Sequence, residues 1–164
     1  MSAATGNPPV VTYSVRPAHP EDFPHLDALY TDNMRVHVER LGTWDPLLFR
    51  DVFNLQECEV ITSDGEIIGL RKIVRSTKEI YLAELQVGKG YRNFGIGGAL
   101  LKEVVDEAER TRKRLWLQVI KGNPAENLYR RMGFRPFAEG YAHRKLEYCP
   151  LGVEGRRGWL GWWR

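Results

Sequence analysis

A glycine-rich segment, residues 88–98, constrains the fold of this chain more than any other feature of its sequence. Apolar residues alternate in residues 79–87 before it, which predicts a strand, and recur at helical spacing in residues 100–108 after it. Glycines have no Cβ atom, so backbone N–H groups and the positive end of a helix dipole can approach an anion closely. The glycines that lead into the helix are Gly95, Gly97 and Gly98. The segment therefore predicts a phosphate-binding loop at a helix N-terminus.

Three other loops share this richness in glycine: a turn without a ligand, a P-loop and a dinucleotide-binding loop. The P-loop does not fit, because no Gly-Lys-Ser or Gly-Lys-Thr sequence follows. A dinucleotide-binding loop needs Gly or Ala three positions after Gly97, where this chain has Leu100. A turn without a ligand stays open at this point.

The rest of the chain predicts one mixed α/β domain with the order β-α-α-β-β-β-α-β-α-β-β. Asp64-Gly65 separates two strand patterns and is typical of a tight hairpin. Pro24 is expected to interrupt the first helix, and Asn123 to cap the last one. The other predicted elements are strands at residues 11–16, 57–63, 66–74 and 115–120, two strands between 134 and 148, and helices at 21–38, 47–53 and 123–133.

Composition narrows the class of protein. The chain has 164 residues, 43% of them hydrophobic, which suits one core. A net charge of +3, with basic and acidic residues interspersed, argues against a nucleic-acid partner. Cys58 and Cys149 lack the spacing of a zinc site or a disulfide framework, so we expect no metal ion and reduced thiols. No signal peptide or membrane span is recognisable, and we therefore expect cytoplasmic residence.

The domain organisation has three expected parts. Residues 1–9 are small, polar and rich in proline, and we expect a flexible arm. Residues 10–148 form the domain. Residues 149–164 are a tail rich in Trp and Arg, which we expect to dock on the body or to form a homodimer contact.

Two segments resemble a known family. The run Arg92-x-x-Gly95-x-Gly97, after a strand that ends in Leu85-x-Val87, is similar to the coenzyme A pyrophosphate loop of the GNAT N-acetyltransferase superfamily. The second segment, residues 123–134, resembles the Asn…Ala-x-x-Leu-Tyr-x-x-x-Gly-Phe signature of that superfamily. The resemblance covers residues 10–148. It implies the GNAT fold: a mostly antiparallel sheet of about seven strands, splayed between residues 79–87 and 115–120, with four helices.

The resemblance also implies a co-substrate, acetyl-CoA, and the residues that bind it. The pantetheine arm would lie in the splay and bond to main-chain groups as an added strand. Its expected main-chain partners are Leu85, Gln86 and Val87, with Asn123 as a further contact. The pyrophosphate would contact N–H groups of Arg92, Asn93, Phe94, Gly95, Ile96, Gly97 and Gly98. Positive charge near these segments comes from Lys89, Arg92, Lys121, Arg130 and Arg131.

The resemblance assigns the chemistry to two side chains. Tyr129 matches the general acid of the family, since a phenol stays protonated at neutral pH and can give a proton to a thiolate. Glu84 is placed to accept the proton of an ammonium group. The alternatives are a tyrosine of the core and a strand carboxylate at the surface. The predicted reaction is direct attack by a primary amine in a ternary complex; a non-catalytic acyl-CoA sensor of the same fold is the alternative.

The acceptor is predicted only as a class. It would be a small-molecule amine or a protein amino group, contacted by Tyr30, Trp44 or Asp45 from the first two helices. His143 is a further candidate for this pocket, but a solvent-facing strand histidine is the favoured interpretation. His19, His25 and His37 are expected to have no role.

Overall fold

A computed structural model of the protein describes residues 10–156. The arm at residues 1–9 and residues 157–164 of the tail lie outside this part of the chain. The strands are β1 (Ser14–Pro17), β2 (Cys58–Ser63), β3 (Glu66–Arg75), β4 (Glu79–Val87), β5 (Arg114–Ile120), β6 (Arg135–Glu139) and β7 (His143–Tyr148). The helices are α1 (Phe23–Glu39), α2 (Leu48–Val52), α3 (Ile96–Thr111) and α4 (Ala125–Arg131), with short 3-10 turns η1 (Pro20–Asp22) and η2 (Lys89–Tyr91). The predicted order of strands and α-helices is confirmed.

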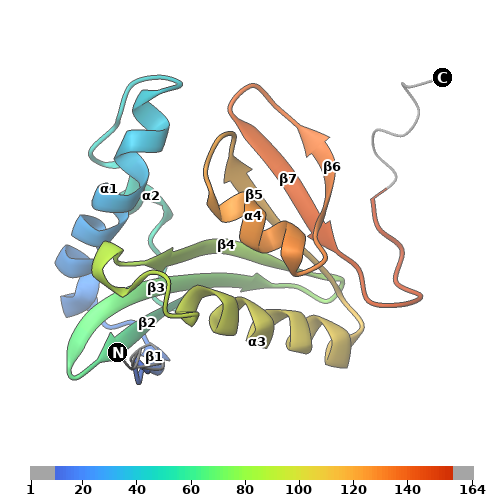
Figure 1. The fold of residues 1–164 in the computed structure, drawn as a ribbon, viewed down its shortest axis with the longest axis horizontal. Coiled ribbons are helices and arrows are strands. Elements are labelled where there is room, and N and C mark those ends of the chain that lie inside the picture. Colours follow the sequence, from blue (N-terminus) through green and yellow to red (C-terminus); the bar gives the residue numbers. More distant parts are fainter. Residues whose placement is uncertain (1–9, 157–164) are drawn as a thin grey trace, which may run out of the picture.

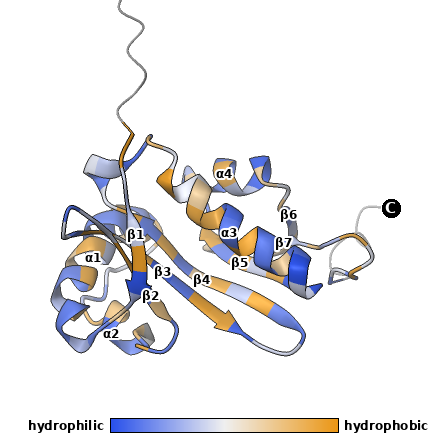
Figure 2. Ribbon diagram, turned by 90° about the horizontal axis from the view of Figure 1, so that it is seen from below, coloured by the Kyte–Doolittle hydropathy of each residue, from blue (hydrophilic) through white to orange (hydrophobic). Residues whose placement is uncertain are grey.

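One seven-stranded sheet, in the order β1-β2-β3-β4-β5-β7-β6, forms the centre of the molecule (Figure 1). Every neighbouring pair is antiparallel except β4 and β5, which α3 connects in parallel. Helices α1 and α2 cover one face, and α3 and α4 cover the other (Figure 2). The apolar stripe of α3 packs on β4 and β5, while α1 and α2 enclose a second cluster with β2 and β3. This arrangement confirms the expected mostly antiparallel sheet of seven strands with four helices.

The sheet opens between β4 and β5. Their pairing runs only from Glu79 opposite Arg114 to Leu82 opposite Leu117. Beyond that point the strands diverge, as Figure 1 shows for β5 and β7 relative to β4. The last part of β4 therefore has β3 on one side and an open edge on the other, where the family resemblance implied a splay.

A β-bulge marks the start of this opening. Ile73 lies opposite Leu82, but Lys72 lies opposite Glu84, so Ala83 is an extra residue in β4. Side chains alternate along a strand, and an extra residue reverses which face each later side chain points to. Glu84 thereby leaves the α3 face, where Leu82 is buried in the core, and faces α1 instead.

Several predicted boundaries are wrong. Pro24 does not interrupt α1: it is the second residue of the helix, where its fixed φ fits and no N–H is needed. The loop before α3 ends at Gly95, so Gly97 lies in the first helical turn. The first strand begins at Ser14 rather than at residue 11.

Candidate active site

A cleft of about 990 Å³ lies where β4 and β5 separate. Its walls come from α1, β4, the loop before α3, β5 and α4. Of the residues predicted to bind the coenzyme or to act on the substrates, those that line the cleft are Glu84, Leu85, Gln86, Val87, Arg92, Asn93, Gly95, Ile96, Gly97, Gly98, Asn123 and Tyr129. Phe94 is not among them, and this residue is 40% exposed.

The loop before α3 leaves room for a ligand. Gly95 has a φ of 79° in the left-handed region, which favours glycine, and its carbonyl accepts the hydrogen bond of Ala99 N–H. A Cβ atom on Gly97 would meet only Leu128 at 3.8 Å and Val87 at 3.9 Å, which is ordinary contact. Protein packing therefore does not require glycine at position 97. The Ile96 side chain is buried in the core, so this residue can offer only its N–H group.

The main-chain groups of β4 point alternately toward β3 and toward the opening, so only some of the predicted pantetheine contacts can reach the cleft. Gly88 N–H donates to Ile68 O in β3 at 2.8 Å, and antiparallel pairs alternate in their hydrogen bonding. The main chain of Gln86, two residues earlier, therefore faces β3. Leu85 and Val87 face the opening and fit an added strand, although the Val87 carbonyl already accepts bonds from Asn33 and Arg92.

Glu84 is the only carboxylate among the described residues that line the cleft. Desolvation raises its pKa to about 7, against the lowering effects of a hydrogen bond from Gln86 and the charge of Lys72. The Gln86 Nε2 group donates to Glu84 Oε2 at 3.0 Å. A carboxylate with this pKa changes its protonation state near neutral pH, as a general base requires.

Tyr129 lies on α4 and is buried, with 8% of its surface exposed. Its ring packs against Phe134 at a centroid distance of 5.9 Å. Burial and the charge of Glu84 raise the pKa of its hydroxyl well above 10. Within residues 10–156 the hydroxyl makes no hydrogen bond. It is therefore protonated, and it is not engaged in holding the fold together.

Asn123 stands at the start of α4. Its Oδ1 accepts a bond from Ala125 N–H at 2.9 Å, which is a cap of the kind predicted, although the helix itself begins only at Ala125. Glu126, three residues after Asn123, does not complete a capping box, because its carboxylate pairs with Arg130 and Arg144. The Asn123 amide nitrogen makes no bond among the described residues and remains available to the cleft.

Comparison with known proteins decides the family. The model of the acetyltransferase (GNAT) domain matches residues 54–136, which is half of the chain. The chain belongs to the GNAT acetyltransferase family. Streptothricin acetyltransferase of Streptomyces lavendulae is 36% identical over 78 residues, which make up 45% of this chain and 41% of that protein. The GNAT domain thus matches less than half of the length of this relative.

Two solved structures are similar to this GNAT domain over most of its length. The PaiA N-acetyltransferase of Thermoplasma acidophilum, in complex with coenzyme A, has a TM-score of 0.69 at 17% identity and covers 84% of this chain and 99% of its own. NAA60 of Arabidopsis thaliana, in complex with a bisubstrate analogue, has a TM-score of 0.61 at 25% identity, with the same coverage. The first similarity establishes the fold.

The basic residues predicted near the coenzyme have different positions in the GNAT domain. Arg92 and Arg131 line the cleft. Lys121 instead pairs with Glu139 at 2.7 Å, and Arg130 with Glu126 at 2.7 Å. Lys89 is exposed and does not line the cleft.

Residues that sequence reasoning missed also line the cleft. Asn33, His37 and Gln118 do so, together with the predicted candidates Tyr30 and His143. These residues lie far apart along the chain, so no local sequence pattern indicates that they belong to one site. They come together only because α1 crosses the sheet. The other two acceptor candidates do not line the cleft: Trp44 packs in the core with Tyr30, and Asp45 caps a turn through Leu47 N–H.

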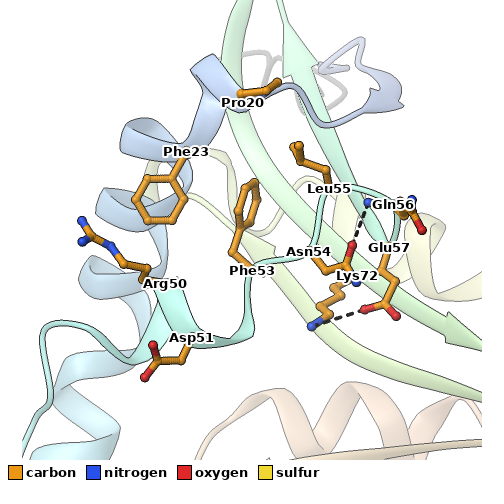
Figure 3. A pocket seen from close by; sticks show the side chains of 10 residues that line it. All are labelled: Pro20, Phe23, Arg50, Asp51, Phe53, Asn54, Leu55, Gln56, Glu57 and Lys72. Atoms are coloured by element: carbon orange, nitrogen blue, oxygen red, sulfur yellow. Dashed lines mark hydrogen bonds and ion pairs between the residues drawn. The ribbon is translucent and has the colours of Figure 1, made fainter.

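A second, open groove of about 1150 Å³ lies between the start of α1 and the connection from α2 to β2 (Figure 3). Figure 3 shows Phe23 and Phe53 on one side of it and the ion pair of Lys72 with Glu57, 3.5 Å long, on the other. The groove shares no lining residue with the cleft. Its connection with the cleft is electrostatic, since the charge of Lys72 acts on Glu84.

No helix in residues 10–156 combines the length and the hydrophobicity of a membrane span. In the same part of the chain, no group of three or more His, Cys, Asp or Glu side chains is arranged to hold a metal ion.

Proposed function

We propose that the protein transfers an acetyl group from acetyl-CoA to a primary amine by direct attack within a ternary complex. One observation carries the proposal. Among the described residues, a single carboxylate lines the cleft, Glu84, with a pKa of about 7. Tyr129 lines the same cleft, and burial and the charge of Glu84 raise the pKa of its phenol. The structural relative PaiA, which binds coenzyme A in its crystal structure, supports the choice of co-substrate.

The residues that would hold the coenzyme fit its chemistry. Leu85 and Val87 offer main-chain groups on an open strand edge, and the first turn of α3 offers N–H groups beside Gly97. Arg92 and Arg131 add positive charge at the cleft. When bound, acetyl-CoA supplies an acetyl group that is activated as a thioester.

Glu84 and Tyr129 would handle the two protons of the reaction. Glu84 accepts the proton that the ammonium group loses, so that a neutral amine nitrogen can form the new bond to the acetyl carbon. Tyr129 donates a proton to the sulfur as the carbon–sulfur bond breaks. No covalent acetyl-enzyme is required: Cys58 is buried, which raises the pKa of its thiol, and Cys149 does not line the cleft.

The acceptor is proposed as a compound that presents one primary amine to Glu84. Tyr30, His37 and His143 line the same cleft and can contact the rest of such a compound. The similarity to streptothricin acetyltransferase favours a small molecule, and the similarity to NAA60 keeps protein amino groups in the panel to be tested. Both described cysteines are free thiols, in keeping with the reducing cytoplasm that we propose as the location.

Thiol release from acetyl-CoA, measured with a panel of primary amines, tests the proposal. We expect at least one amine to raise the rate above that with water, and Glu84→Gln to lower it. Binding of acetyl-CoA without amine-dependent thiol release would refute the proposal and favour the alternative, a sensor that binds acyl-CoA without turnover.

A further inference from the structure

A line of side-chain hydrogen bonds connects the loop before α3 with Glu84 by way of α1. Arg92 Nη2 donates to Asn33 Oδ1 at 2.6 Å. Asn33 Nδ2 donates to Gln86 Oε1 at 3.1 Å, and Gln86 Nε2 donates to Glu84 Oε2 at 3.0 Å. The bonds join segments that are up to 59 positions apart in the sequence.

Arg92 sets the direction of every bond in this line. A guanidinium group only donates hydrogen bonds, so Asn33 must turn its oxygen toward Arg92 and its NH2 group toward Gln86. Gln86 then turns its own oxygen toward Asn33 and its NH2 group toward Glu84. The opposite orientation of the Gln86 amide would place two acceptors, its oxygen and the carboxylate, against each other.

Burial makes this orientation costly to change. Asn33 is 4% exposed and Gln86 9% exposed, so a broken bond would leave a polar group without water. Both Arg92 Nε and Asn33 Nδ2 also donate to the Val87 carbonyl, each at 3.1 Å, which fixes their positions relative to β4. Glu84 therefore lies at the end of a network in which each buried amide has one favoured orientation.

We propose that Asn33 and Gln86 are positioning residues that hold the Glu84 carboxylate in one orientation toward the cleft. The inference rests on the proposed function, in which Glu84 accepts the proton of the amine. Asn33 makes no bond with Glu84, so it acts only through Gln86. The other charged or titratable groups that act electrostatically on Glu84 or feel its charge are Lys72 of β3, Tyr81 of β4, Tyr30 of α1, Tyr129 of α4 and Cys58 of β2.

A titration of the protein without coenzyme tests the inference. The 13C NMR signals of the glutamate side-chain carboxyl carbons are followed against pH, and the Glu84 signal is assigned by its loss in Glu84→Gln. Gln86→Leu removes the hydrogen bond that Gln86 donates to this carboxylate, and we expect the Glu84 midpoint to rise by about one pH unit. Asn33→Leu keeps the side-chain size and adds no charge, but it cannot donate to Gln86. We expect a rise here too.

Gln118→Leu is the matched control. Gln118 lines the same cleft and donates to the Tyr81 hydroxyl at 3.2 Å, but it does not belong to the network. Its loss should leave the Glu84 midpoint in place. An unchanged midpoint in a folded Asn33→Leu protein would overturn the inference, whatever its activity. This variant also serves if Gln86→Leu does not fold.

Kinetics give a second readout. The acid limb of kcat/KM for the amine should move upward with the NMR midpoint in both variants. In a Glu84→Gln background, Asn33→Leu should cause no further change in the pH profile, because two residues that act as a unit are not additive. A further change would mean that Asn33 acts on another group, and would contradict the inference. A protein that titrates as expected but transfers no acetyl group would disprove the proposed function alone.

Discussion

Glu84 lies directly opposite Lys72 in the register of β3 and β4. The bulge at Ala83 creates this pairing, since without it Lys72 would lie opposite a different residue of β4. Desolvation raises the pKa of Glu84, while the charge of Lys72 lowers it. Desolvation is the larger effect, so the pKa of Glu84 is about 7, above its ordinary value. The position of one extra strand residue thus influences both the direction and the proton affinity of the predicted base.

Lys72→Met should move the acid limb of kcat/KM to higher pH, because the folded protein loses a positive charge that stabilises the Glu84 carboxylate. Glu57→Gln is the control: it removes the ion-pair partner of Lys72, 3.5 Å away, and keeps the lysine charge. The pH dependence of thiol release measures both. If Glu57→Gln moved the acid limb of kcat/KM upward as far as Lys72→Met does, the shift would come from a structural change in the second groove. The charge of Lys72 would then not be its cause.

Glu84→Gln should stabilise the fold at alkaline pH. The pKa of Glu84 is about 7 in the folded protein, against an ordinary value of 4.5 for a glutamate side chain, so the unfolded chain loses this proton more readily. Ionisation therefore costs stability as the pH rises from about 4.5, and the full cost is present above about 7. Since part of the side chain reaches solvent, we expect a gain of about 1–3 kcal/mol at alkaline pH.

Urea unfolding of Glu84→Gln and wild type at about pH 8 and about pH 4 checks this expectation. The two proteins should differ at the higher pH and should be nearly equal at the lower one, where the wild-type carboxyl is protonated in both states. Equal stability at the higher pH would show that Glu84 is well solvated and ionises at its ordinary pKa.

The sequence predicted most of the elements because their signals are local. The β4 bounds follow from its apolar pattern, and Asp64-Gly65 forms the expected hairpin with φ angles of 49° and 81°. The bulge at Ala83 has no such signal, because it depends on how β3 and β4 pair. The contact of Asn33 with Gln86 joins residues 53 positions apart, and it depends on where α1 crosses the sheet.

Gly97→Asp should abolish binding of acetyl-CoA, because a carboxylate would occupy the first turn of α3 and repel the pyrophosphate. Gly97→Ala is the matched control for the fold. Its Cβ atom meets no protein atom closer than 3.8 Å, so the free protein should be stabilised by roughly 0.5–1 kcal/mol through the loss of a helical glycine. Calorimetry with acetyl-CoA and thermal unfolding measure the two effects. Unchanged affinity in folded Gly97→Asp would show that this turn binds no phosphate.

Tyr129→Phe should remove proton donation and leave the fold intact. The phenyl ring keeps its packing against Phe134, and the hydroxyl that is lost makes no hydrogen bond within residues 10–156. General-acid assistance is worth about 10²–10⁴ in rate, and a thiolate leaves partly unaided, so we expect kcat to fall by about 10²-fold. Thermal unfolding and the affinity for acetyl-CoA should stay close to wild type.

The kinetic pattern of Tyr129→Phe separates proton donation from substrate binding. If the hydroxyl acts in the transition state, kcat and kcat/KM for the amine fall together and KM changes little. Because burial raises the pKa of Tyr129 well above 10, its ionisation should produce no alkaline loss of activity in the wild type up to about pH 9. Wild-type kcat in the variant would assign Tyr129 to packing alone, and a rise in KM at constant kcat would assign it to amine binding.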